Sequence, residues 1–301
     1  MDILIKNTLL ADTLLADVHA KKDLAFLSTD FIIYHASEQL RLNKKLRKQF
    51  VEAPFEKLVK SSEYKQLVKD IRAKCRTSYA VFQIPSLVQR RKDLLETTKL
   101  SDTTAMDELL QTHLSTKERI SIYPELLALI QNMLQKINCN LSGESVIDSV
   151  LDLACGLNPI AYYYFTKSIK TRFVCNEQSD LDCAQLNTFF QNNHLPANAH
   201  SFDLVRETTK LQLAPLDQKY DVCFLLKTLD TLESQRLYVT YDVLKNIRAR
   251  LIVASFPIRS IRGKRMDRSE QIFWFEKMLG RLEFKFTRQV IGDEVFYFCN
   301  K

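Results

Sequence analysis

Residues 150–159, with the sequence VLDLACGLNP, combine residue types and spacing that could do chemistry. Apolar residues surround one acid, Asp152, as in a buried strand that carries a single carboxyl group. A turn of small residues follows, and Pro159 can open a helix because its fixed φ suits the first helical turn. A strand, turn and helix in this order leave free backbone N–H groups where a ligand can approach closely.

The turn indicates which ligand it could hold. It contains one glycine, Gly156, so the dinucleotide fingerprint with three glycines is absent. Asp152 in the strand, followed by Ala154 and Gly156, fits S-adenosyl-L-methionine (SAM) better. The alternative is an ordinary strand–turn–helix without a ligand.

The elements that must position this turn follow Gly143, where short apolar runs alternate with helical patterns, as in βαβ units. After the strand that leads into the turn, we predict strands over residues 172–177, 199–203, 221–227 and 251–257, and a closing hairpin from strands over 284–291 and 294–299. Five strand–helix steps and a hairpin match the seven-stranded, Rossmann-like sheet of class I SAM-dependent methyltransferases. The predicted fold class is therefore α/β.

Polar residues recur at the ends of these predicted strands, where ligands bind in such sheets. The second strand ends in Asn176 and Glu177, at the place where an acid would accept hydrogen bonds from the ribose hydroxyls. Asp203, with Leu204 beside it, would face adenine, and Lys227 would stand near the methyl donor or the target. A strand-end Asp is often only a helix cap, so the recurrence matters more than any single residue.

Composition limits the possible classes of protein. The 301 residues are 46% hydrophobic and 26% charged, as in soluble globular proteins. No apolar run reaches the roughly 18 residues that span a bilayer, and the N-terminus has no signal-peptide pattern. Seven cysteines never form C-x-x-C, which favours a reducing compartment and argues against zinc. We therefore expect a cytoplasmic protein with no bound metal and no membrane partner.

The basic charge lies in the first third of the chain. Residues 1–100 contain 19 Lys and Arg against 12 Asp and Glu, whereas the remaining residues contain 24 of each. Apolar spacing and the absence of glycine before Gly143 predict helices there. We expect a basic helical domain over residues 1–110 and a second domain over 111–301. A polyanion is the expected partner, and a solvated helical surface is the alternative.

Two further segments are notable. Ser115 and Glu118 fit a capping box, which predicts that a helix begins there. After the predicted strand at 251–257, residues 255–268 contain five cations and one acid, on the edge expected to hold the SAM pocket. Such a loop could bind the phosphates that flank a target base.

The sequence resembles the aminoglycoside-resistance family of 16S rRNA (guanine-N7)-methyltransferases, which act on guanine 1405. Four stretches carry the resemblance, namely HLSTKER (113–119), VLDLACGLNP (150–159), SFPIRSIRGK (255–264) and IGDEVFYF (291–298). The family usually has Asp where this chain has Asn176. Either Asn176 makes the ribose contact, or a local distortion brings Glu177 to that place.

The resemblance implies a role for each matching residue. Arg119 would contact the carboxylate end of SAM, Ala154 and Gly156 would line the pocket, Asp203 would meet adenine, and Lys227 would lie beside the target. The N-terminal domain would bind rRNA. The implied rRNA-binding residues are Arg41, Lys44, Lys45, Arg47, Lys48, Arg259, Ser260, Arg262 and Lys264.

The resulting hypothesis is methyl transfer from SAM to guanine N7 in 16S rRNA of an assembled 30S subunit, which implies aminoglycoside resistance. Guanine N7 has an available lone pair, so the reaction needs no catalytic base. We expect the enzyme to act as a monomer. The alternatives are a methyltransferase for another rRNA or tRNA base, a small-molecule methyltransferase, and an RNA-binding homologue that has lost SAM binding.

Overall fold

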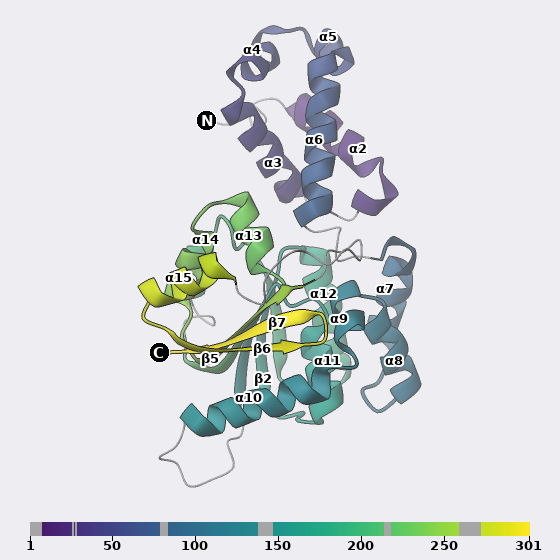
Figure 1. Cartoon of the computed structure of the whole chain (residues 1–301). Helices are drawn as coiled ribbons and strands as arrows, with labels where there is room; N and C mark the ends of the chain where they lie inside the picture. The colour runs from purple at the N-terminus through teal and green to yellow at the C-terminus, as the bar shows by residue number, and fades with distance from the viewer. Residues whose placement is uncertain are drawn as a thin grey trace. The chain divides into compact units, whose positions relative to one another are not determined.

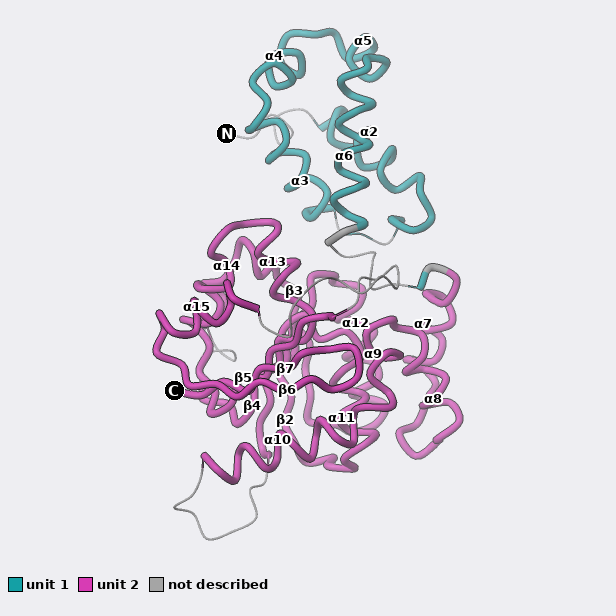
Figure 2. The backbone as a smooth tube through the Cα atoms, in the orientation of Figure 1, with its two compact units in different colours: residues 1–85 teal, residues 86–301 magenta. Residues whose placement is uncertain are grey.

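The computed structural model describes residues 8–25, 27, 29–78, 84–137, 147–213, 218–258 and 272–301. It contains two compact units, residues 1–85 and 86–301 (Figure 2). The division comes earlier than the boundary expected at residue 110. The reason is that α7 (Val88–Thr97) packs on α12 (Asp180–Asn192), and α8 (Thr103–Gln111) packs on α11 (Asn158–Thr166).

The first unit is helical, as the spacing of its apolar residues predicts. Its elements are α2 (Thr8–His19), η1 (Lys22–Leu24), α3 (Thr29–Leu42), α4 (Lys44–Glu52), α5 (Phe55–Lys60) and α6 (Ser62–Ser78). Leu10, Phe31 and Ile71 belong to its buried core. A half-buried polar contact joins α6 to α2, in which the Tyr64 hydroxyl donates to Asp17 at 2.6 Å.

The second unit is built on one seven-stranded sheet with the order β3-β2-β1-β4-β5-β7-β6 (Figure 1). The strands are β1 (Ser149–Leu153), β2 (Arg172–Glu177), β3 (Ala197–Ser201), β4 (Tyr220–Leu226), β5 (Ala249–Pro257), β6 (Lys285–Ile291) and β7 (Glu294–Asn300). Strand β7 pairs antiparallel with both β5 and β6, and the other strand pairs are parallel. The predicted α/β sheet and its closing hairpin are confirmed, although β3 ends two residues before Asp203.

Helices cover both faces of the sheet because successive strand residues point to opposite sides. Val150 joins a core with α10 (Tyr123–Ile137), α11 and α12, whereas Leu151 and Leu153 join a second core with α13 (Leu229–Gln235), α14 (Val239–Asn246) and α15 (Phe273–Arg281). The short elements α9 (Leu114–Arg119) and η4 (Thr208–Gln212) belong to the same unit, and η3 (Pro85–Leu87) lies across the division between the two units.

The topology places the polar strand ends together. Strands β1, β2, β3, β4 and β5 are parallel, so their carboxyl ends meet at one edge of the sheet. Strand β7 runs the other way, and its first residue, Glu294, pairs with Pro257 at the end of β5. No helix in the described ranges is long and apolar enough to cross a membrane.

Candidate functional site

The turn after β1 has a backbone that a side chain would disrupt. Ala154 and Gly156 both have positive φ, +54° at each, in the left-handed region. A Cβ added to Gly156 would lie 2.7 Å from Cε1 of His113, so glycine is required there for space as well as for conformation. Pro159 lies in the first turn of α11, as predicted.

The side chain at the end of β2 that contacts this turn is that of Glu177, not that of Asn176. Its Oε1 accepts the backbone N–H of Gly156 at 2.6 Å. Burial, together with the charge of Asp182, raises the pKa of Glu177 to about 7, although the Gly156 N–H opposes the shift. The Asn176 side chain is buried and donates to the carbonyl of Phe202 at 2.9 Å. Asn176 therefore links β2 to the segment after β3, and Glu177 is the acid at the site.

Asp152 fixes the helix that follows the turn. Its carboxylate accepts from Nδ2 of Asn158 at 2.7 Å, and the Tyr123 hydroxyl donates to Oδ1 of Asn158 at 3.0 Å. Burial raises the pKa of Asp152 well above its usual value. These hydrogen bonds connect β1 to the starts of α11 and α10, so Asp152 stabilises the position of the turn through Asn158.

A cluster of paired ions lies at the same edge, around the buried carboxylate of Glu294. Its carboxylate accepts from Nε of Arg119 at 2.9 Å and from the Ser255 hydroxyl at 2.8 Å, and it lies 3.1 Å from Nζ of Lys227. Nζ of Lys227 also lies 2.5 Å from Oε2 of Glu118. Two cations and two carboxylates thus neutralise one another beside the ends of β4 and β5.

Arg119 keeps one donor group free for a ligand. The side chain is only 3% exposed, and its Nη2 has no hydrogen-bond partner among the described residues. Burial disfavours the guanidinium cation, but Glu294 and Tyr123 together outweigh it, so the pKa of Arg119 is raised. A buried, permanently charged donor without an acceptor suits an anionic ligand group.

Asp203 and Leu204 shape the segment after β3. The Asp203 carboxylate accepts the backbone N–H of Val205 at 2.7 Å and Nε of Arg206 at 2.8 Å. The Leu204 side chain belongs to the core on the face of α13 and α14. The carboxylate of Asp203 is therefore held by its own loop.

The segment 113–119 forms the predicted helix but lacks the predicted cap. Helix α9 begins at Leu114 with His113 as its N-cap, and no side chain caps it. The predicted capping box is wrong, because Ser115 lies inside the helix and Glu118 bonds to Lys227 instead. Burial and the nearby cations of Arg91 and Arg119 lower the pKa of His113 to about 3. The ring is therefore neutral where it packs on Gly156.

Sequence reasoning missed three residues of this site, which are His113, Glu118 and Glu294. The string HLSTKER predicts no role for His113 and only a helix cap for Glu118, and Glu294 is predicted only as part of a hairpin strand. One signal was present for Glu294, since it is an acid followed at once by the apolar run VFYFC. An acid in a buried strand needs a buried partner.

The N-terminal residues with an implied rRNA role are exposed in the first unit. They are Arg41, Lys44, Lys45, Arg47 and Lys48, at the end of α3 and along α4. Arg41 pairs with Glu38 at 2.8 Å, and Lys48 lies 3.9 Å from Glu52. The other implied set, Arg259, Ser260, Arg262 and Lys264, lies outside the described residues.

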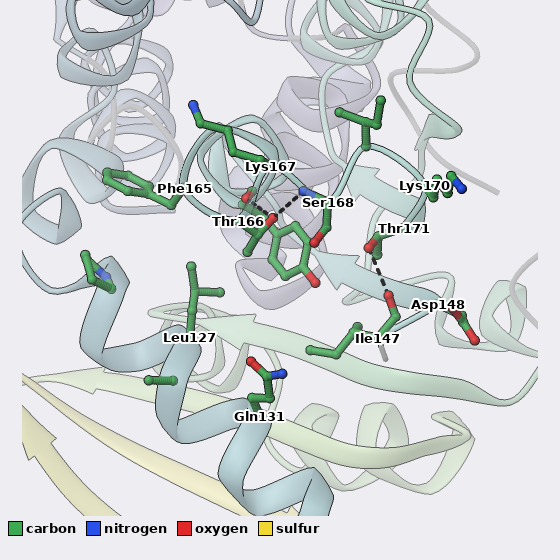
Figure 3. Close-up of a pocket in the computed structure, with 14 residues that line it drawn as sticks. Leu127, Gln131, Ile147, Asp148, Phe165, Thr166, Lys167, Ser168, Lys170 and Thr171 are labelled. Atoms are coloured by element: carbon green, nitrogen blue, oxygen red, sulfur yellow. Dashed lines mark hydrogen bonds between the residues drawn. The ribbon is translucent and has the colours of Figure 1, made fainter. Parts of the chain in front are cut away.

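A cavity of about 710 Å³ lies at the other end of the strands, between α10 and the loop that follows α11 (Figure 3). Lys167, Lys170 and Thr171 from that loop line it, together with Leu127 of α10 and Ile147 just before β1. None of the candidate site residues lines this cavity. No group of His, Cys, Asp and Glu in the described part of the chain could hold a metal ion.

The strand order and the turn after β1 define an α/β protein of the class I methyltransferase fold. The structure of the 16S rRNA methyltransferase RmtF, solved with S-adenosyl-L-homocysteine, superposes with a TM-score of 0.69 at 21% identity, covering 97% of this chain and 98% of that one. The model of the ribosomal RNA methyltransferase family FmrO matches residues 85–296. The chain belongs to this family.

Two curated relatives bear the name 16S rRNA (guanine(1405)-N(7))-methyltransferase. The protein from Micromonospora rosea is 30% identical over 196 residues, which are 64% of this chain and 64% of that protein. The protein from Micromonospora echinospora is 30% identical over 201 residues, which are 65% of this chain and 66% of that protein. The chain thus matches just under two thirds of the length of these relatives.

Proposed function

We propose that the protein transfers a methyl group from SAM to N7 of guanine 1405 in 16S rRNA of the small ribosomal subunit. The main support is the hydrogen bond from the Gly156 N–H to the carboxylate of Glu177. Lys227 and the Arg119–Glu294 ion pair lie at the same edge of the sheet. The names of the Micromonospora relatives support the choice of base and atom.

The described residues fit SAM in a definite order along the sheet edge. The free Nη2 of Arg119 would bind the carboxylate of the methionine part. Ala154 and Gly156 would line the middle of the pocket, and the Glu177 carboxylate would accept from the ribose hydroxyls. The segment with Asp203 and Leu204 would contact adenine. SAM would supply an electrophilic methyl group bound to a sulfonium.

Catalysis would consist mostly of alignment. The lone pair of N7 forms the new N–C bond while the C–S bond breaks and its electrons remain on sulfur, so no proton needs to be removed. The protein must hold a base that has left the helical stack, with N7 in line with the methyl–sulfur bond. Lys227, beside Glu118 at the end of β4, would contact this base.

The first unit and the segment after β5 would hold the ribosomal RNA. The exposed cations of α4, Lys44, Lys45 and Arg47, would bind phosphates, as would Arg259 and Arg262. We propose that a monomer acts on the assembled 30S subunit. The methyl group adds positive charge where cationic aminoglycosides bind, so the modification would confer resistance.

The decisive experiment is methyl mapping. Purified 30S subunits are incubated with labelled SAM and the protein, the RNA is cleaved at N7-methylguanine by borohydride reduction and aniline treatment, and the cleavage site is located by primer extension. A stop at guanine 1405 supports the proposal, whereas modification of another base, or of free nucleosides only, contradicts it. Calorimetric titration with SAM provides the separate test of cofactor binding, and no heat of binding would favour an RNA-binding homologue without activity.

The segment after β5 is tested by charge reversal. Arg259→Glu and Arg262→Glu should weaken binding to the 30S subunit while the dissociation constant for SAM stays unchanged. If subunit binding remained intact, the assignment of this segment would be wrong.

A further inference from the structure

Glu118 and Lys227 form an ion pair whose two members differ in accessibility. Nζ of Lys227 lies 2.5 Å from Glu118 and 3.1 Å from Glu294, and its side chain is only 9% exposed. The Glu118 side chain is 45% exposed. The buried carboxylate of Glu294 therefore holds the ammonium in place, and the carboxylate of Glu118 beside it remains accessible to a ligand.

The backbone also fixes the position of Lys227. Its φ is +56°, in the left-handed region, and its N–H donates to the carbonyl of Ser255 at 3.1 Å. The ammonium has three donors, of which Glu118 and Glu294 use two. One donor remains for a ligand at this end of β4.

A carboxylate next to an ammonium matches one edge of guanine. That edge presents two adjacent donors, N1–H and the N2 amine, followed by the acceptor O6. Adenine presents an acceptor at N1 and a donor amine, so the same pair of side chains would leave both of its groups mismatched. N7 lies on the far side of O6 and stays free to react.

We propose that Glu118 and Lys227 together read the target guanine, a role that rests on the proposed function. Glu118 accepts from N1–H and the N2 amine, and Lys227 donates its third proton to O6. Glu294 and Arg119 hold the pair in place, so the four charges sum to zero before the substrate arrives.

The contact gains strength during the reaction. As the N7–C bond forms, the guanine ring acquires the positive charge that leaves sulfur, and N1–H becomes a stronger donor while keeping its proton. A hydrogen bond from N1–H to an ionised acceptor is therefore stronger in the transition state than in the bound substrate. Loss of Glu118 should lower kcat more than it raises KM.

The test combines a variant of the protein with a variant of the base. Glu118→Gln is compared with Glu125→Gln, which changes an exposed glutamate of α10. The substrates are 30S subunits reconstituted with guanine or inosine at position 1405, because inosine lacks only the N2 amine. Methylation rates and the SAM dissociation constant are measured for each combination.

We expect Glu118→Gln to lower kcat/KM about 10- to 100-fold on guanine with unchanged SAM affinity, and Glu125→Gln to match the wild type. Replacing guanine by inosine should clearly lower the methylation rate of the wild type. The same replacement should lower the rate of Glu118→Gln only a little further, because the variant already lacks the carboxylate that accepts from the N2 amine. An inosine penalty of equal size in both proteins would overturn the reading role. A wild type that fails to methylate guanine-containing subunits would instead refute the proposed function.

Discussion

The charged residues of the two units are arranged in opposite ways. In the first unit, Lys44, Lys45 and Arg47 are exposed along α4. At the sheet edge of the second unit, Arg119 and Glu294 are each 3% exposed and bonded to each other. Exposed cations gain little from any single partner and are screened by salt, whereas a buried pair depends on both of its members.

The comparison shows how charge serves two purposes in one chain. Exposed cations suit a long polyanion, because many weak contacts add without a fixed geometry. Buried ions suit a small site, because each is held by named partners at fixed distances.

Glu294→Ala should have the largest effect. The change removes the acceptor that Arg119, Lys227 and Ser255 share, and leaves a buried guanidinium without its partner. We expect a loss of about 3–5 kcal/mol in the free energy of unfolding, measured by urea denaturation of the second unit. Glu38→Ala, which breaks an exposed pair with Arg41, should leave stability unchanged. Equal losses in the two variants would contradict the comparison.

Gly156→Ala should abolish most SAM binding. The new Cβ would lie 2.7 Å from the His113 ring in a backbone with φ of +54°. We expect the SAM dissociation constant to rise about 100-fold, which corresponds to roughly 3 kcal/mol of strain. Gly280→Ala in α15, where no atom lies within 4 Å of the added Cβ, is the matched control and should bind SAM normally.

Glu177 should make SAM binding depend on pH. Its pKa is raised to about 7 in the free protein, so the carboxylate acceptor forms only as the pH rises through this value. We expect SAM affinity to increase about tenfold between pH 6 and pH 8, measured by calorimetry, because one pKa unit corresponds to a tenfold change. Glu177→Gln should bind SAM more weakly and without this dependence.

The raised pKa of Glu177 makes the free energy of unfolding decrease with rising pH, whereas SAM affinity increases. A carboxyl group with a raised pKa binds its proton more tightly in the folded state than in the unfolded state. Its contribution to stability is therefore complete below the unfolded value, 4.5, and is lost as the pH rises through about 7. Urea denaturation across this range should show a decline that Glu177→Gln lacks, and identical pH profiles would refute the raised pKa.

Lys45→Ala should have the smallest effect. One exposed cation of α4 contributes one phosphate contact, so 30S affinity should fall only a few-fold and the slope of log affinity against log salt should fall by about one. Lys285→Ala, at an exposed position of β6, should leave both quantities unchanged. A salt slope that Lys45→Ala did not alter would remove α4 from the proposed rRNA contact.

Local patterns predicted much of the fold. Alternating strand and helix patterns predicted the sheet, and β2 has the predicted bounds, Arg172–Glu177. The structure divides at residue 85, before the predicted boundary at residue 110, because α7 and α8 share the helical pattern of the first unit but pack on helices of the second. Which core a helix joins depends on its packing partners, and these lie far away in sequence.

The strand–turn–helix at residues 150–159 follows from local sequence alone, because small residues and proline act locally on φ and ψ. The basic character of the first third also follows from the sequence alone. Which of Asn176 and Glu177 contacts the Gly156 turn depends on the tertiary structure, because side-chain direction follows from the pairing of β2 with β1 and β3. The tertiary structure alone brought Glu118, Lys227 and Glu294 together, since long-range packing, not spacing, sets such contacts.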